Sequence, residues 1–484
     1  MIVALLPWIA FLGALGILFT PAKNLNALRS IAIGSTFFCL ALTLYLFFNW
    51  NPSIAGFQHV LSFDFFPEAG IYYQTGIDGV GLTFCLLTAL VSSAGIIPAL
   101  RQSQSLKAYL LSYLLLTGCL FSVFTVLNIF FLYLFYEMTL IPIFIMIGLA
   151  GSPEKKKDAV IRLAIYMTLG AVAGLFAILS LYHLFGPEFL SLTQSQALLA
   201  EKASLLTPQS QQWFAGLLIV GFGVMTVLFP FHSWAPVTYG AAPVSLALLH
   251  AGVKAGPYIL LRLAVTYLPE GFRFWATPLA CLAAAGILYG GLVAMRQKNL
   301  RGLAAFSSIS HMGYIFLAFA SLNEASLTSG ILLAFAHGLM IACFFALIEI
   351  LENRSGTDQI NHFGGLGKSM PFIGVCFIHT AMASSGVPGF ANFPAELLIF
   401  ISGWLTFPVP VAIAVFGVLI TSVYMIRAVH SVCFGTESPS SAGYQDARGL
   451  EKVPFYILLG ALIVFGIFPS LLLKVIQPAV KAIL

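Results

Sequence analysis

Long continuous apolar runs recur along the whole chain and are separated by short polar segments. A helix needs roughly 20 apolar residues to cross a bilayer, where it satisfies its own backbone hydrogen bonds. Only 8% of the 484 residues are charged, whereas a soluble protein carries roughly 25%. An outer-membrane barrel is excluded because its strands alternate apolar and polar residues. The sequence therefore predicts an all-α polytopic membrane protein, with a single transmembrane domain over residues 1–484.

The apolar runs predict about 14 transmembrane helices. Segments that follow odd-numbered runs hold most of the 22 basic residues, including Lys155, Lys156 and Lys157. Segments that follow even-numbered runs hold mainly acids, such as Asp64 and Glu68. Basic loops stay on the cytoplasmic or matrix side of a membrane, so we expect both termini to lie on the outer, periplasmic side. This distribution accounts for the formal charge of +5 without a nucleic-acid partner.

Two apolar regions are interrupted by residues that break helices. The first lies within 222–262, and the second is SGVPGFANFPAE at 385–396. The residues that mark these interruptions are Pro230, His232, Trp234, Pro236 and Pro388. Non-helical backbone at membrane depth persists only where protein or a water-filled cavity satisfies its polar groups. We therefore expect the first interruption to form a hydrated centre.

The two interruptions are an odd number of predicted spans apart, so they have opposite orientations in the membrane. Paired broken helices of this kind indicate the inverted repeats of transporters, whose sites lie near the membrane midplane. We therefore predict two inverted five-helix repeats, each with one broken helix. The predicted divisions are an N-terminal three-helix region at 1–107, repeats at 108–268 and 274–432, and a C-terminal helix at 453–484.

Ionisable residues lie well inside several apolar runs, where burying a charge is costly. They are Glu137, His250, Lys254, His311, His337 and Glu396. His250 and Lys254 are four residues apart, so we expect them to share one helix face. Arg262 lies nearer the end of its run, and we expect its charged group to reach the membrane surface. Each group alone is compatible with a structural hydrogen bond between helices, but a chain of them across several spans predicts a proton relay.

Six sequence blocks follow one another along nearly the whole chain. They are GIDGVGLTF, FYEMTLIP, PFHSW, LRGLAAFSSISHMGY, AHGLMIACFF and GFANFPAELLIF. In these blocks the chain resembles the antiporter-like membrane subunits of respiratory complex I, and most closely chain M, which is chain 4 in mitochondria and chloroplasts. The wider family includes Mrp-type cation/proton antiporters and membrane-bound hydrogenases.

The resemblance implies a proton-translocating subunit that is driven by electron transfer in other chains of an NADH– or ferredoxin–quinone oxidoreductase. It also implies that NADH, FMN, iron–sulfur clusters and quinone bind to partner subunits and that this chain carries no cofactor. The seven cysteines form no CxxC pair that would suggest a metal or a cluster here. The implied partners are L- and N-type antiporter-like subunits and small membrane subunits, in a bacterial inner, thylakoid or mitochondrial inner membrane.

The resemblance also assigns roles residue by residue. Glu137 resembles the fifth-helix glutamate of the proton channel, and Lys254 resembles the central lysine of the eighth helix. Glu396 is similar to the acid that replaces a lysine on the twelfth helix in chain M. His311 and His337 resemble the histidines of the connecting polar axis.

One position departs from the family. Its members have a lysine five residues before the P-x-H motif of the broken seventh helix, and this chain has Met225 there. That lysine pairs with the fifth-helix glutamate, so we expect Glu137 to lack a cationic partner and to stay neutral. The alternative interpretation is therefore a diverged subunit of a Mrp-like antiporter, a membrane hydrogenase or a CO2-uptake complex, with altered or absent pumping. A self-contained transporter for an organic solute also fits the broken helices, but the sequence marks no substrate pocket.

Overall fold

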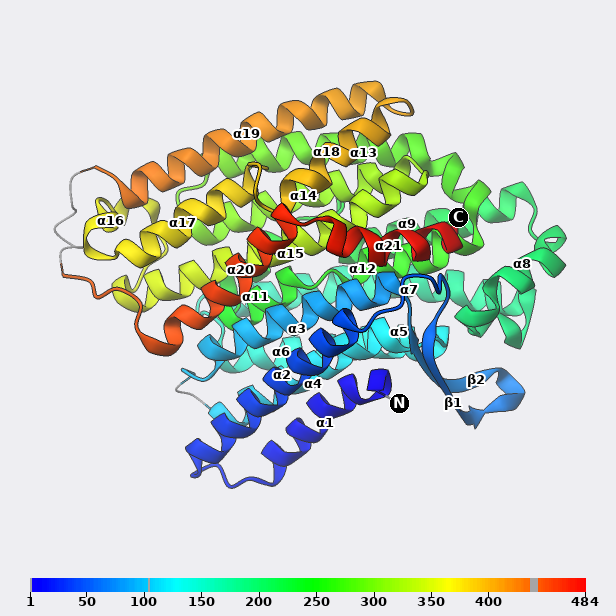
Figure 1. The fold of residues 1–484 in the computed structure, drawn as a ribbon, viewed down its shortest axis with the longest axis horizontal. Helices are drawn as coiled ribbons and strands as arrows, with labels where there is room; N and C mark the ends of the chain where they lie inside the picture. The colour runs from blue at the N-terminus through cyan, green and yellow to red at the C-terminus, as the bar shows by residue number, and fades with distance from the viewer. Residues whose placement is uncertain (1, 103–104, 436–442) are drawn as a thin grey trace.

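Helices dominate the computed structural model, which describes residues 2–102, 105–435 and 443–484 (Figure 1). Most of the long helices run in a common direction, as they do in a membrane bundle (Figure 1). Within the described ranges, 12 helices are long and apolar enough to cross a membrane. The chain is thus a polytopic helical membrane protein, as the sequence predicts.

The helices of the two halves of the chain are separated by an interruption after Met225. Those before it are α1 (Ile2–Phe19), α2 (Leu25–Phe48), α3 (Gly79–Ala99), α4 (Leu106–Thr125), α5 (Ile129–Met138), α6 (Leu140–Ala150), α7 (Lys156–Phe185), α8 (Ser195–Lys202) and α9 (Pro208–Met225). Those after it are α10 (Trp234–Ala241), α11 (Val244–Gly252), α12 (Ala255–Leu260), α13 (Pro269–Arg296), α14 (Leu300–Ala320), α15 (Glu324–Ser355), α16 (Leu366–Ser369), α17 (Pro371–Ser384), α18 (Asn392–Trp404), α19 (Pro408–Cys433), α20 (Val453–Ile467) and α21 (Ser470–Ile483).

Two regions that the sequence predicts as broken spans are not among these 12 helices. In the first, α9 ends at Met225 and α10 begins at Trp234. In the second, α17 ends at Ser384 and α18 begins at Asn392. If each region crosses the membrane once as a broken helix, the total equals the expected number of about 14. That total and the inverted repeats remain predictions.

The centre of the bundle is formed by α3 and α15, whose membrane-length segments are fully buried, together with α14 and the α11–α12 region. A helix that is apolar around its whole circumference belongs in such a position. Peripheral helices such as α2 and α7 bury only 33% of the corresponding segment. The central helices are the ones that carry Lys254, His311 and His337, so the fold holds these groups away from the lipid.

Two segments add to or change the expected architecture. The chain between α2 and α3 forms an antiparallel hairpin at one end of the bundle, with strands β1 (Gln58–Phe66) and β2 (Ile71–Ile77) (Figure 1). The single C-terminal helix expected at 453–484 is two helices, α20 and α21. The interruption falls at Pro469, which cannot continue a helix because it has no backbone N–H. The second helix, α21, packs against α3 and α15.

Candidate functional site

Lys254 lies at a break in its helix, at the centre of the bundle. The first part, α11, ends at Gly252, Val253 is extended, and α12 begins after Lys254. Such a break leaves carbonyl groups without helical partners, and the Nζ of Lys254 donates to the carbonyl of Ala251. The prediction that His250 and Lys254 share one helix face is therefore wrong, because the helix does not continue between them.

A cavity of about 70 Å³ adjoins Lys254, and we name it the Lys254 cavity. Its walls include His250 of α11, Met225 of α9, Tyr136 of α5 and Trp234 of α10. A space of this size with polar groups in its walls is large enough for several waters. His250 and Lys254 therefore meet at one hydratable space, although they lie on separate helices.

The break between α9 and α10 forms one wall of the Lys254 cavity. Trp234 opens α10, and its indole N–H donates to the carbonyl of Val224 in the last turn of α9, at 2.9 Å. This hydrogen bond satisfies a carbonyl group near the end of α9, where helical donors run out. Pro236 stands in the first turn of α10 and Pro230 in the break itself, two positions where a proline displaces no helical hydrogen bond.

Glu137 is half-buried near the end of α5, and Met225 is the last residue of α9. The Met225 side chain lines the Lys254 cavity and packs against Gly170 of α7. Within the part of the chain that the structure describes, Glu137 Oε1 is buried and has no hydrogen-bond partner. The sequence of α9 contains no basic residue, so this helix offers Glu137 no cation.

The second break, between α17 and α18, encloses Glu396. Gly386 lies in this break with φ +63°, a left-handed conformation that favours glycine. A Cβ at Gly386 would meet Oε2 of Glu396, so a larger residue here would displace the carboxyl group. Pro388 lies in the same break and prevents the helix from continuing. Glu396 itself is only 4% exposed.

His311 of α14 and His337 of α15 stack on each other, with ring centroids 4.7 Å apart. The Nδ1 of His311 lies 2.8 Å from the carbonyl of Ser307, and the Nε2 lies 3.1 Å from the carbonyl of Ser384, the last residue of α17. Carbonyl oxygens only accept hydrogen bonds, so the imidazolium form alone satisfies both contacts at once. Glu396 Oε1 lies 4.0 Å from Nε2 and supplies the opposite charge when it is ionised.

A close backbone contact joins the two groups of residues. Gly252, where α11 ends, lies against Gly338, the residue after His337. A Cβ at Gly338 would collide with the Gly252 carbonyl, so this approach requires glycine. The structure thus brings the Lys254 cavity beside the histidine pair. His232, by contrast, is buried outside the lining of that cavity.

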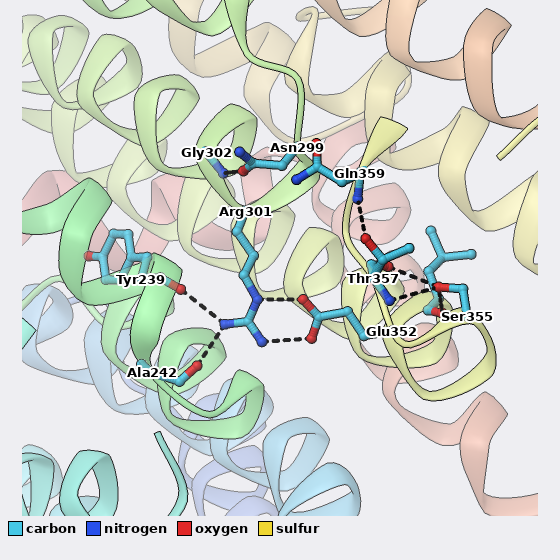
Figure 2. Close-up of polar contacts among 10 residues, drawn as sticks. Tyr239, Ala242, Asn299, Arg301, Gly302, Glu352, Ser355, Thr357 and Gln359 are labelled. Atoms are coloured by element: carbon cyan, nitrogen blue, oxygen red, sulfur yellow. Dashed lines mark hydrogen bonds and ion pairs between the residues drawn. The ribbon is translucent and has the colours of Figure 1, made fainter. Parts of the chain in front are cut away.

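Arg301 forms a clamp that the sequence pattern does not single out (Figure 2). Its Nη2 lies 2.7 Å from Oε2 of Glu352, and its Nη1 donates to the carbonyls of Tyr239 and Ala242 at 3.0 and 2.6 Å. These carbonyls belong to the end of α10, where no helical donors remain. The Arg301–Glu352 clamp therefore ties α10 to α14 and α15. The sequence does contain a signal for this pair, because Arg301 lies at the start of one span and Glu352 at the end of the next.

Arg262 is buried against an acid within the protein, a contact that the sequence analysis does not predict. It is 3% exposed and forms an ion pair with Asp78, the N-cap residue of α3. Its guanidinium also lies over the rings of Tyr258 and Phe57, at 4.8 and 5.2 Å from their centroids. The segment before β1 covers this end of the helix. The positive charge of Arg262 is therefore neutralised by Asp78 of the same chain rather than by water. Asp78, an acid at the very start of an apolar run, was the available signal.

The groups gathered near these breaks are acids and bases buried in an apolar body, as in the proton relays of pumps and transporters. Among the described residues, no group of three or more His, Cys, Asp or Glu is placed to hold a metal ion.

The fold and the site together define an antiporter-like membrane protein. A family model described as NADH:quinone oxidoreductase/Mrp antiporter, TM matches residues 126–421. The chain belongs to this family.

Individual relatives match nearly the whole chain. NAD(P)H-quinone oxidoreductase chain 4 1 of Synechococcus elongatus is 32% identical over 99% of this chain and 91% of its own length. F(420)H(2) dehydrogenase subunit M of Methanosarcina mazei is 31% identical over 97% of this chain and 95% of its own length. A chain of respiratory complex I from Thermus thermophilus with bound NADH is similar in structure, with a TM-score of 0.89, 29% identity, and coverage of 100% of this chain and 99% of that chain. The resemblance stated from the six sequence blocks is confirmed.

Proposed function

We propose that the chain is the proton-translocating, antiporter-like subunit of a complex-I-type NADH– or ferredoxin–quinone oxidoreductase. Electron transfer in other subunits drives changes of protonation along a buried axis of this chain. The axis consists of Glu137, His250, Lys254, His311, His337 and Glu396. The observation that carries the proposal is the contact of Gly252 with Gly338, because it joins a hydratable lysine to a buried histidine pair at membrane depth.

The proposal extends to the surroundings of the chain. Both termini lie on the outer side of the membrane, and the divisions at 1–107, 108–268, 274–432 and 453–484 describe its repeats. L- and N-type antiporter-like subunits and small membrane subunits are its neighbours, and NADH, FMN, iron–sulfur clusters and quinone bind to partner chains. Full-length similarity to proteins named chain 4 and subunit M supports this arrangement.

A second candidate function is favoured by Met225. Here the chain is a diverged subunit of a Mrp-like antiporter, a membrane hydrogenase or a CO2-uptake complex, with altered or absent pumping. The absence of a basic residue from α9, which therefore offers Glu137 no cation, supports this alternative. Purification of the native assembly separates the two candidates. Iron–sulfur and NADH-binding subunits support the first, whereas antiporter or carbonic-anhydrase-like partners support the second.

The direct test is Lys254→Ala in the native assembly, reconstituted into proteoliposomes. We expect electron transfer and assembly to persist and coupled proton movement to be lost, because the hydratable base of the axis is gone. Lys202→Ala is the matched control, since Lys202 pairs with Glu188 outside the central helices. Full coupled pumping by the Lys254→Ala assembly contradicts the proposal.

A further inference from the structure

A second cavity opens at the end of the bundle that carries the β1–β2 hairpin. Its volume is about 420 Å³, and its walls come from the chain before β1, from β2 and from the end of α21. Gln74, Gln196, Asp78 and Arg262 are among the polar side chains that line it. We name it the hairpin-side cavity, and in the orientation proposed above it faces the outer side of the membrane.

The Asp78–Arg262 ion pair lies in the wall of this cavity and is almost fully buried. Its two side chains are 5% and 4% exposed. Desolvation offsets most of the attraction between charges at such depth, so a pair of this kind adds little to stability. Its presence therefore points to a role for fixed charge at this position.

A short stretch of helix separates this ion pair from Lys254. Lys254 is the N-cap residue of α12, Tyr258 lies within α12, and Arg262 lies in the π-helical turn that follows, Leu261–Val265. The ring of Tyr258 packs against those of Phe84 and Phe124, with centroids 5.6 and 5.0 Å away. All three rings are buried, and none of them lines either cavity. Because Tyr258 lies between Lys254 and Arg262 in the chain, we infer that these rings form an aromatic plug between the Lys254 cavity and the hairpin-side cavity.

We propose that Arg262, held by Asp78 above the Tyr258 plug, is the outer electrostatic seal of the Lys254 cavity. Its fixed positive charge keeps protons from passing between Lys254 and the hairpin-side cavity. A fixed arginine excludes protons and cations from water-filled pathways in the same way. Asp78 acts through Arg262 by positioning the guanidinium. The inference rests on the proposed function, because a seal matters only where Lys254 exchanges protons.

The seal predicts an asymmetry between two substitutions that break the same ion pair. Arg262→Met removes the positive charge and leaves the Asp78 carboxylate, which accepts protons, in the cavity wall. Passive proton conductance is then expected to rise several-fold. Asp78→Asn removes the carboxylate but keeps the positive charge, so conductance stays close to that of the unchanged protein. A plug that acts through packing alone predicts equal effects for the two substitutions.

The measurement uses the purified native assembly in proteoliposomes without an electron donor, with an imposed pH gradient and an entrapped pH-sensitive dye. Arg273→Met is the matched control, because it breaks the exposed Arg273–Glu270 pair at the same end of the bundle. If Arg262→Met alone fails to assemble, the double variant with Asp78→Asn leaves no unpaired charge and is expected to leak more than Asp78→Asn. No rise in conductance on loss of Arg262, or an equal rise with Asp78→Asn, overturns the seal.

A further substitution separates this inference from the proposed function. Lys254→Ala in the Arg262→Met background is expected to return the leak to the control level, because the leaking protons cross at Lys254. A leak that persists in this variant overturns the claim that Arg262 guards Lys254. The proposed function is tested separately, by measuring proton pumping of the Lys254→Ala assembly while an electron donor is present. The leak is measured without an electron donor, so the two outcomes are independent.

Discussion

The breaks at α11–α12 and at α17–α18 differ in what surrounds their ionisable groups. At the α11–α12 break, Lys254 borders a cavity, and His250 Nε2 has no hydrogen-bond partner within the described ranges. At the α17–α18 break, Glu396 is enclosed by Gly386, and His311 has a backbone carbonyl at each ring nitrogen. The first region leaves room for water. In the second, a carbonyl lies at each ring nitrogen of His311, although His337 Nδ1 and the side-chain amide of Asn392 have no hydrogen-bond partner among the described residues. The fold thus places a hydratable cavity beside a more tightly packed group of polar side chains.

The largest expected effect on assembly and pumping comes from adding a side chain at Gly386, in the packed α17–α18 break. Gly386→Ala adds a Cβ that collides with Glu396, at a left-handed φ of +63° that by itself costs an alanine about 1–2 kcal/mol. We expect less assembled subunit and no coupled pumping by what remains. Gly356→Ala is the matched control, because its φ is +73° and no atom lies within 4 Å of the added Cβ. Equal pumping and melting temperatures for the two variants contradict the enclosure of Glu396.

Adding a cation to the wall of the Lys254 cavity tests the hydratable region. Met225→Lys places an ammonium in the wall of the Lys254 cavity, where water is able to solvate it and Glu137 gains a candidate partner. We expect more protons pumped per electron pair, measured in donor-driven proteoliposomes. Met225→Leu keeps the wall apolar and should leave the ratio unchanged. An unaltered ratio in a fully assembled Met225→Lys complex means that the missing lysine does not limit Glu137.

The smallest expected effect is on stability, and it comes from loosening α10, which forms one wall of the Lys254 cavity. Arg301→Gln removes the Arg301–Glu352 clamp, whose hydrogen bonds to a charged group are worth about 1.5–3 kcal/mol. We expect the melting temperature of the assembly to fall by several degrees, because α10 loses its tie to α14 and α15. Arg162→Gln breaks the exposed Arg162–Asp158 pair, which is worth about 0.2–1 kcal/mol, and serves as the control. A melting curve that matches this control shows that the clamp does not hold α10.

Local patterns predict much of the fold and part of the site. The membrane class and the breaks at Pro230 and Pro388 follow from residues within single segments, because apolar length and proline act on one helix at a time. The prediction that His250 and Lys254 share one helix face failed because the helix breaks at Val253, four residues before Pro257, which cannot donate to the Val253 carbonyl. The burial of Arg262 depends on the segment that covers the helix end, which lies far away in the sequence. The Arg301–Glu352 and Arg262–Asp78 pairs join residues 51 and 184 positions apart. No spacing within one helix relates such residues.

The sequence alone determined that this chain lies in a membrane, that two of its helices are interrupted and that acids and bases are stranded at membrane depth. These are properties of each segment, set by its length, its prolines and glycines and its charges. Only the tertiary structure decided which of those groups meet. The approach of Gly252 to Gly338 and the burial of Arg262 against Asp78 depend on distances between helices, and no pattern along one helix encodes them.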